Sequence, residues 1–232
     1  MNSLKYKLYL VAFILFYSCN SFAQGFSFND SNIIFQNSNG KNLTKAEIEE
    51  IVKSPFGINK STDPSGKKII KLIPTTNAAH ESYLKQKELF RKSLIGKPMP
   101  DFIMKSIAGK MFNKSELIGK TIVFNFWFIA CEPCKREIPF LNSLVQKYKN
   151  KEVTFLGPSF DKIPELKKFL YSTSFQYQII PDAKNYIDLL KIETFPLDII
   201  VDKKGIIVEV IQGNNDRETE ALLTKAIDKA LL

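Results

Sequence analysis

The stretch "FNFWFIACEPCKREIP", residues 124–139, contains two cysteines separated by two residues, Cys131 and Cys134. The run "KTIVFNFWF" leads into this pair, and its continuous apolar and β-branched residues predict a buried strand over residues 120–128. Apolar residues recur three or four positions apart after the pair, which predicts an amphipathic helix. The two cysteines are therefore expected at a strand-to-helix junction, with Cys131 at the helix N-terminus and Cys134 one turn inside.

This placement suits thiol–disulfide exchange. The N–H groups and the dipole at a helix N-terminus stabilise an anion, so Cys131 is expected to be an exposed nucleophile with a stabilised thiolate. Cys134 would be the shielded thiol that resolves a mixed disulfide. Glu132 puts a negative charge beside that thiolate, which favours a reducing couple. Glu137 is either a proton donor or acceptor for the site or an ordinary exposed glutamate of the helix.

The N-terminus has the pattern of a secretory signal. Two lysines precede an apolar run, and Ser21-Phe22-Ala23 follows as a small-x-small cleavage pattern. We predict a signal peptide over residues 1–23, cleaved near Ala23, and a periplasmic or other extracytoplasmic location, where disulfides form. An uncleaved membrane anchor and lipid attachment at Cys19 are the alternatives.

Cysteine and histidine counts narrow the role of the pair. Cleavage near Ala23 would remove Cys19 and leave Cys131 and Cys134 as the cysteines of the mature chain. The loop that they close is too short for a large stabilising effect, which disfavours a purely structural disulfide. Structural zinc needs four Cys or His ligands and a cysteine hydrolase needs a nearby base, but the single histidine, His80, is distant in sequence. No metal is therefore expected.

Composition and patterning indicate a globular α/β protein. The chain has 232 residues, of which 44% are hydrophobic and 25% charged, and its formal net charge of +9 is scattered. It shows no nucleic-acid-binding motif. Residues 24–95 are predicted to form a small N-terminal extension or subdomain that includes a helix capped by Thr44 and Glu47. Over residues 96–232, strands alternate with helices and a hairpin precedes the last helix, which predicts a mixed central sheet flanked by helices.

The residues around the cysteines resemble a known family. The order is Trp, three residues, Cys-x-Pro-Cys, two residues, Glu, an apolar residue and Pro, as in the active-site motif of thioredoxin-like proteins, in particular the exported TlpA and ResA branch. The segment "GKPMPDF" resembles the opening segment that this branch shares with peroxiredoxins, the AhpC/TSA redoxins. The resemblance covers about residues 95–232 and implies a thioredoxin-like fold without cofactor or metal. The motif residues are Trp127, Cys131, Pro133, Cys134, Glu137, Ile138 and Pro139.

The resemblance also implies roles for particular residues. Pro196, preceded by Phe195, stands where this fold has a cis-proline facing the disulfide. Pro196 would join the catalytic set of Cys131, Cys134 and Glu137. The residues expected to shape a substrate groove are Trp127, Pro133 and Phe195, with Phe128 and Ile129 extending its apolar surface.

One position departs from the thioredoxin pattern. Thioredoxin has a buried aspartate two residues before the tryptophan, whereas this chain has Asn125. An amide cannot exchange protons as a carboxylate does, so proton transfer would fall to Glu137 or to water.

The resulting expectation is an exported thiol–disulfide oxidoreductase that reduces disulfides in partner proteins. The resemblance suggests exported dithiol proteins such as apocytochrome c as substrates and a membrane-bound electron donor. Two other classes remain open from the sequence. They are a thiol peroxidase of the peroxiredoxin type and a non-catalytic binding protein on a thioredoxin scaffold.

Overall fold

The computed structural model describes residues 32–51, 56–212 and 216–232, and it divides the chain after Gln86 into two compact units. The predicted signal peptide and Cys19 lie outside the described residues. The division falls inside helix α3 (Asn77–Leu94), earlier than the predicted boundary at residue 95. The reason is that the end of α3, from Lys87 on, belongs to the second unit, within which Arg91 forms a 2.8 Å ion pair with Glu209.

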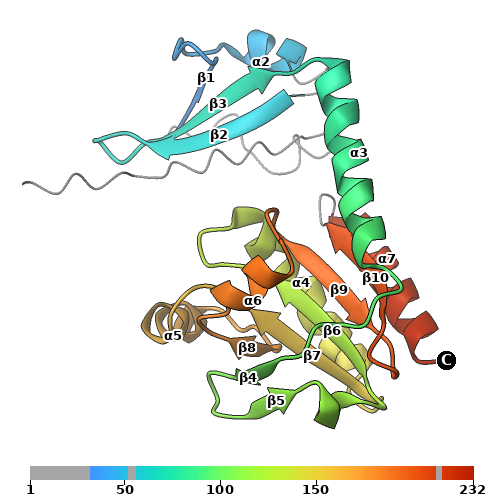
Figure 1. Ribbon diagram of the computed structural model, residues 1–232. Coiled ribbons are helices and arrows are strands. Elements are labelled where there is room, and N and C mark those ends of the chain that lie inside the picture. The colour runs from blue at the N-terminus through green and yellow to red at the C-terminus, as the bar shows by residue number, and fades with distance from the viewer. Residues whose placement is uncertain (1–31, 52–55, 213–215) are drawn as a thin grey trace, which may run out of the picture. The chain divides into compact units, whose positions relative to one another are not determined.

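The N-terminal unit contains a three-stranded sheet in the order β1-β3-β2 (Figure 1). Strand β1 (Ile33–Gln36) runs parallel to β3 (Lys68–Pro74), which pairs antiparallel with β2 (Phe56–Thr62). Helix α2 (Lys45–Ile51) contributes to the core of this unit. The buried core residues are Phe35, Ile48, Phe56, Ile58, Ile70 and Leu72.

The sequence predicts short strands over Asn32–Gln36 and over "KKIIKLIP", residues 67–74, which are confirmed as β1 and β3, and the helix α2 is confirmed as well, whereas β2 was not predicted. Phe56 and Ile58 alternate as strand residues should, yet Gly57 and Asn59 between them have low strand propensity. In the folded unit β2 pairs with β3 along its whole length and buries Phe56 and Ile58. Tertiary pairing therefore overrides the weak local preference.

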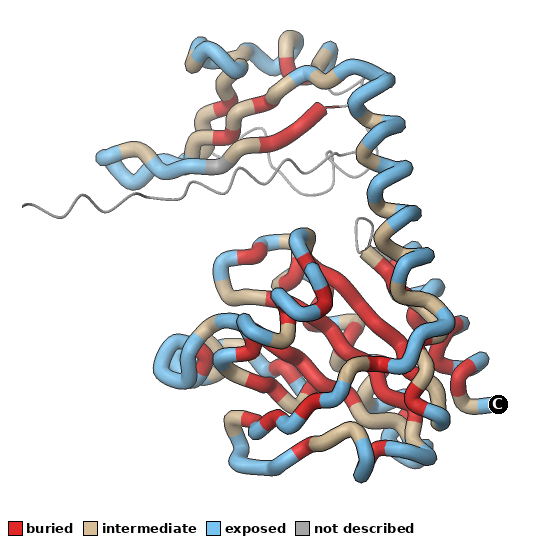
Figure 2. Tube along the Cα trace, viewed as in Figure 1, coloured by how far each residue is buried: buried red, intermediate tan, exposed pale blue. Residues whose placement is uncertain are grey.

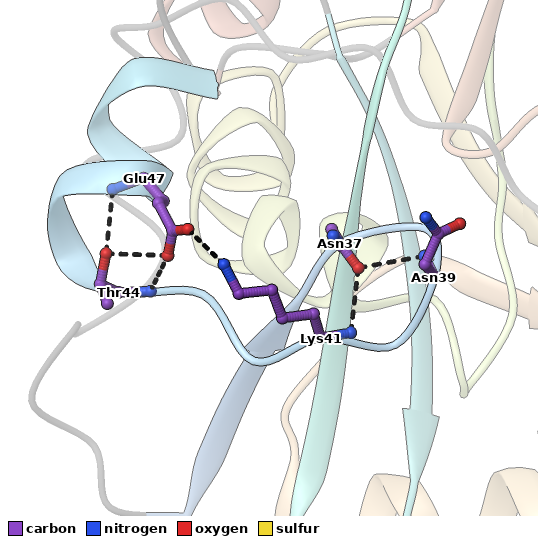
Figure 3. Close-up of polar contacts among 5 residues, drawn as sticks. All are labelled: Asn37, Asn39, Lys41, Thr44 and Glu47. Carbon is purple, nitrogen blue, oxygen red and sulfur yellow. Dashed lines mark hydrogen bonds and ion pairs between the residues drawn. The ribbon is translucent and has the colours of Figure 1, made fainter.

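Helix α2 begins with the predicted capping box (Figure 3). Glu47 Oε2 accepts a hydrogen bond from the Thr44 backbone N–H at 2.8 Å, and Thr44 Oγ1 accepts one from the Glu47 N–H at 3.3 Å. The Lys41 ammonium, followed by the bonds from Thr44, lowers the pKa of Glu47 to about 2. In the preceding turn, Asn37 Oδ1 accepts from the N–H groups of Asn39 and Lys41.

The capping box yields a stability prediction. Thr44→Ala should lower the free energy of unfolding of the N-terminal unit by about 1 kcal/mol, because the N–H of Glu47 loses its side-chain acceptor. Urea unfolding followed by circular dichroism measures this loss. Thr44→Ser keeps the hydroxyl and should restore most of it, and equal stability of all three proteins would contradict the capping role.

The second unit is built on a five-stranded sheet in the order β10-β9-β6-β7-β8. The pairs β6–β7 and β7–β8 are parallel, whereas β6–β9 and β9–β10 are antiparallel, so the sheet is mixed as predicted. Its strands are β6 (Thr121–Phe126), β7 (Val153–Pro158), β8 (Gln178–Ile180), β9 (Leu197–Val201) and β10 (Ile207–Gln212). Its remaining helices are η1 (Ser115–Leu117), α4 (Glu132–Lys147), α5 (Ile163–Ser172), α6 (Lys184–Leu189) and α7 (Asp216–Ala230).

Helices cover both faces of this sheet (Figure 1). Thr121 Oγ1 on β6 donates to the Ala230 carbonyl of α7, and α7 contacts α4 on the same face. On the other face, the Tyr186 ring of α6 lies 6.5 Å from the Phe124 ring of β6. This arrangement confirms the predicted α/β architecture.

A short hairpin precedes the sheet. Strands β4 (Ile103–Lys105) and β5 (Met111–Asn113) pair antiparallel around a turn at Gly109, which has a φ of +86°. Glycine adopts this left-handed conformation without the steric penalty of a side chain. The segment "KPMPDFIMKSIAGKMFNKSEL" predicts an extended hairpin that turns at Ala108-Gly109, and the pairing of β4 with β5 confirms this prediction.

Two adjacent inner strands of the sheet are buried along their whole length. Every residue of β6 and β9 is buried, as the red tubes in Figure 2 show. Strands covered on both faces require continuous apolar sequence, which explains the run that leads into the cysteine pair. Thr121, Asn125 and Asp198 are the polar exceptions within these strands, and all three are buried. In the described ranges no helix combines the length and apolar content needed to cross a bilayer.

Candidate active site

Cys131 and Cys134 form a disulfide at the N-terminus of α4. Cys131 is the N-cap residue, and its Sγ accepts a hydrogen bond from the Cys134 backbone N–H at 3.2 Å. Pro133 lies in the first turn, where its missing N–H costs nothing because that group has no intrahelical partner. The strand-to-helix placement predicted for the pair is confirmed.

The two sulfur-bearing residues are less different in exposure than the sequence suggested. Cys131 is 6% exposed and Cys134 is 2% exposed. The prediction of an openly exposed Cys131 is wrong for this disulfide form. The physical reason is that Cys131 folds back over the first turn of α4 to bond Cys134, so its sulfur faces the helix.

The charge of Glu132 is partly balanced by a neighbour. Lys135 Nζ lies 2.6 Å from Glu132 Oε1, one helical turn away on the exposed side of α4. An ion pair of this kind reduces the repulsion that Glu132 would exert on a Cys131 thiolate. The helix N-terminus and the Cys134 N–H then act on that thiolate with less opposition than the sequence alone implied.

Glu137 lies on the buried side of α4. It is 2% exposed, so the alternative of an ordinary exposed glutamate is excluded. Because Glu137 follows Cys134 by three residues, the two side chains lie on the same helix face one turn apart. A carboxyl group therefore faces the interior directly after the buried cysteine.

The Phe195–Pro196 peptide bond is cis and lies immediately before β9, as the resemblance implies. Strand β9 is antiparallel to β6, so its amino end lies beside the carboxyl end of β6, the strand that leads to Cys131. Both Phe195 and Pro196 are buried, with Phe195 8% exposed.

Three phenylalanines cluster at this edge of the sheet. The Phe128 ring lies 4.9 Å from the Phe160 ring and 5.3 Å from the Phe195 ring, and Phe160 and Phe195 are 5.9 Å apart. The carboxyl ends of the parallel strands β6 and β7 and the amino end of β9 meet here. Phe160, 37% exposed, is the most accessible of them. Sequence reasoning found Phe128 and Phe195 but missed Phe160, which stands after β7 without a local signal.

Asp161 fixes the loop that carries Cys131. Its Oδ2 accepts hydrogen bonds from the Ile129 N–H and the Ser159 hydroxyl, both at 2.7 Å. These bonds join the end of β7 to the loop after β6. Asp161 was not found from the sequence, since it lies 30 residues after Cys131 and only strand pairing brings it near.

Comparison with known proteins decides the family. The sequence profile of the AhpC/TSA family matches residues 95–210. The chain belongs to the AhpC/TSA family. It is 31% identical over 129 residues to the thiol-disulfide oxidoreductase ResA of Bacillus anthracis, which covers 55% of this chain and 75% of that protein. ResA of Geobacillus kaustophilus is 28% identical over 127 residues, covering 53% and 72%.

Solved structures of similar fold agree with this AhpC/TSA membership. A Chlorobium tepidum protein assigned as the thiol:disulfide interchange protein DsbE matches with a TM-score of 0.55 and 26% identity, covering 60% of this chain and 98% of that one. A Bacteroides thetaiotaomicron protein assigned as a protein disulfide isomerase matches with a TM-score of 0.54 and 27% identity, covering 59% and 89%. The protein is a thioredoxin-like thiol–disulfide oxidoreductase of the ResA/TlpA type. It is therefore an enzyme, and the non-catalytic scaffold is set aside.

Trp127 of this AhpC/TSA protein is not at the surface. It is 0% exposed, its Nε1 donates to the Gly157 carbonyl at 3.3 Å, and its ring lies 5.5 Å from Phe169 and 5.3 Å from Phe175. The predicted role of Trp127 in shaping a substrate groove therefore cannot be a direct contact with the substrate in this structure, because aromatic packing covers its side chain. Trp127 can shape the site only by supporting the loop before Cys131 from beneath.

The position that departs from thioredoxin has an unexpected partner. Asn125 on β6 lies opposite Asp198 on β9, and Asn125 Nδ2 donates to Asp198 Oδ1 at 2.9 Å. Asp198 is 0% exposed. Sequence reasoning missed it, although a single carboxylate inside the apolar strand "LDIIV" was a signal, since an acidic residue is seldom fully buried without a partner.

Across residues 32–51, 56–212 and 216–232, no three His, Cys, Asp or Glu side chains gather as metal ligands would.

Proposed function

We propose that the protein is an exported disulfide reductase in which Cys131 is the nucleophile and Cys134 the resolving thiol. The observation that carries this proposal is the Cys131–Cys134 disulfide at the N-terminus of α4, with a buried carboxyl one turn beyond Cys134 and a cis-proline next to the strand edge. A vicinal pair with one sulfur at a helix end and one inside it suits two-step exchange.

The chemistry proceeds in two transfers. The Cys131 thiolate attacks one sulfur of the partner disulfide, a new S–S bond forms, and the other partner sulfur leaves and takes a proton. The Cys134 thiolate then attacks Cys131 Sγ, which releases the second partner thiol and leaves the Cys131–Cys134 disulfide. Two electrons pass from the enzyme to the partner, and an external donor must return them.

Three groups near the pair would assist this chemistry. Glu137 would take or give a proton from the buried side of α4. Pro196 would hold the partner chain beside the disulfide, and Pro133 would limit the start of α4. Phe195 is proposed to select the partner together with Phe128, Ile129 and Phe160. Phe128 and Ile129 belong to the loop before Cys131, and the rings of Phe160 and Phe195 pack against Phe128.

Location and partners follow from the N-terminus and the resemblance. The signal-like residues 1–23 support export to the periplasm or another extracytoplasmic compartment, with cleavage near Ala23 or retention as a membrane-anchored form. The proposed partners are exported proteins with a reducible disulfide, such as apocytochrome c, and a membrane-bound donor would restore the dithiol.

A trapping experiment tests these roles. Cys134→Ser should accumulate mixed disulfides with its partners in cells, because the thiol that releases them is missing. Non-reducing electrophoresis followed by mass spectrometry detects them. The double variant Cys131→Ser/Cys134→Ser should trap nothing. Absence of trapped species with Cys134→Ser, together with no disulfide reduction by the wild type, would refute the proposal.

The same variants separate reduction from peroxidase activity. A peroxidase of the peroxiredoxin type would consume peroxide with Cys134→Ser but not with Cys131→Ser. The proposed reductase should instead lose multiple-turnover disulfide reduction with either substitution.

A further inference from the structure

The interior of the second unit contains a carboxyl group that the proposed two-cysteine chemistry does not yet use. Asp198 is 0% exposed and Asn125 is 1% exposed, and their 2.9 Å hydrogen bond joins the inner strands β9 and β6. Asp198 Oδ2 makes no hydrogen bond within the described part of the chain. A buried carboxyl with a free oxygen needs a functional or structural explanation.

Strand geometry shows which way Asp198 points. Side chains alternate between the two faces of a strand, so Asn125 of β6 lies on the same face as Thr121, whose hydroxyl donates a hydrogen bond to α7. Asp198 of β9 lies directly opposite Asn125 and therefore on that face as well. On the neighbouring strand β7, Phe155 is in register with Val123 and packs against Tyr148 of α4. Asp198 therefore points to the face of the sheet that α4 and α7 cover.

Helix α4 presents its redox end to this same interior. Cys134 and Glu137 are the first two buried residues of α4, and both are 2% exposed. Burial raises the pKa of Tyr177 well above its usual value, and the charges of Asp198 and Glu137 raise it further. Both carboxyl groups are buried: Asp198 lies on the sheet face that α4 covers, and Glu137 lies on the buried side of α4. We refer to these two groups, with Asn125 and Tyr177, as the buried polar region.

Only some members of this region can exchange protons near neutral pH. Tyr177 keeps its proton, and Asn125 does not titrate. Burial raises the pKa of Asp198 to about 7, and the hydrogen bond from Asn125 opposes part of that rise. The titratable groups facing this region are Glu137 of α4, Tyr177 before β8 and, in the reduced enzyme, the cysteines of α4.

We propose that Asp198 is the buried proton acceptor for the dithiol couple, taking over from β9 the role that Asn125 on β6 cannot perform. This inference rests on the proposed roles of Cys131 and Cys134. In the resolving step the Cys134 thiol gives its proton to the Asp198 carboxylate. The Cys134 thiolate attacks Cys131 Sγ, the Cys131–partner bond breaks as the Cys131–Cys134 bond forms, and the partner thiolate leaves and takes a proton from water. Asp198 returns its proton when the disulfide is reduced again.

The pH dependence has a definite sign. Below about pH 7 Asp198 is protonated and cannot accept a proton, so resolution of the mixed disulfide should be slow. As the pH rises through about 7, the carboxylate forms and the rate should increase. Asp198→Asn should remove this inflection and slow resolution at pH 8 by about 10²-fold, the usual effect of losing one acid–base group.

Single-turnover kinetics of a purified mixed disulfide with a model peptide, measured from pH 5 to 9, test this expectation. Asp101→Asn is the matched control, because Asp101 has an exposed side chain and lies outside the site. Its pH profile should coincide with that of the wild type. An Asp198→Asn profile that keeps the inflection near pH 7 would overturn the proposal.

An infrared measurement gives a readout that does not depend on turnover. The C=O band of a protonated carboxyl should disappear from the wild type as the pH rises through about 7, and this change should be missing from Asp198→Asn. If Asp198→Asn does not fold, Asn125→Ala provides the second test. Because the hydrogen bond from Asn125 lowers the pKa of Asp198, its loss should move two transitions to higher pH: the inflection in the rate of resolution and the loss of the infrared band. If neither transition moves, the assignment to Asp198 is contradicted.

The outcomes separate the two proposals. Trapping by Cys134→Ser with an unchanged Asp198→Asn profile would refute the role of Asp198 alone. No trapping and no disulfide reduction by the wild type would refute the two-cysteine mechanism and, with it, the role of Asp198.

Discussion

Replacing Cys131 with serine is expected to reduce the disulfide reductase activity on the order of 10³-fold or more, to the background rate. The serine hydroxyl stays protonated at neutral pH and cannot form a disulfide bond, so neither the first attack nor the mixed disulfide is available. The helix N-terminus and the Cys134 N–H would remain, but they would have no thiolate to stabilise. Turnover of a peptide with one internal disulfide, in the presence of dithiothreitol, measures the loss.

Two other cysteine variants make this prediction specific. Cys19→Ser in the full chain should keep wild-type activity, because Cys19 belongs to the predicted signal peptide. Cys134→Ser should still attack once and then stop as the mixed disulfide. Comparable activity of Cys131→Ser and wild type would assign the chemistry to another residue.

Trp127→Ala is expected to lower the free energy of unfolding of the second unit by about 3–5 kcal/mol. The substitution leaves a cavity where the ring contacts Phe169 and Phe175, and it removes the hydrogen bond to the Gly157 carbonyl. A methyl group added at Gly157 would not fill this cavity without strain, because its Cβ would lie only 3.0 Å from Ile179 Cδ1. In the wild type the same Cβ would also lie 3.4 Å from Trp127 Nε1.

The measurement must use far-ultraviolet circular dichroism in guanidinium, because Trp127 is the single tryptophan and its fluorescence is lost with it. Tyr171→Ala is the matched control. Tyr171 is an aromatic residue of α5, the helix that also supplies Phe169, but it is 96% exposed. Its substitution should change stability by no more than about 0.5 kcal/mol. A loss below about 1 kcal/mol for Trp127→Ala would contradict the supporting role of the ring.

Local patterns in the sequence were sufficient to predict several elements of the structure. Patterns among residues that are close together in the chain predicted the strand before the cysteines, the helix after them, the turn at Gly109 and the capping box of Thr44 and Glu47. Strand β2 shows the limit of this reasoning. Gly57 and Asn59 weaken its local strand preference, and pairing with β3 supplies what the local sequence lacks.

The identity of a residue also did not show whether its side chain is exposed or which neighbour balances its charge. Glu132 and Glu137 are both glutamates of α4, but one pairs with Lys135 near the surface and the other is buried. Helix periodicity places them on different sides of α4, yet only packing against the sheet decides which side is buried. Trp127 was similarly expected to shape a substrate groove because of its position in the motif, and only the tertiary structure shows that the rings of Phe169 and Phe175 cover it.

The sequence by itself determined the thioredoxin-like fold, the Cys131–Cys134 pair at a helix start and the proline before β9, since these features are encoded in contiguous segments. The tertiary structure alone decided that Asp198 stands against Asn125, that Asp161 anchors the loop before Cys131 and that Phe160 joins Phe128 and Phe195. Each of these contacts joins residues that are far apart in the chain. Their proximity depends on strand order and register, which a single sequence does not fix residue by residue.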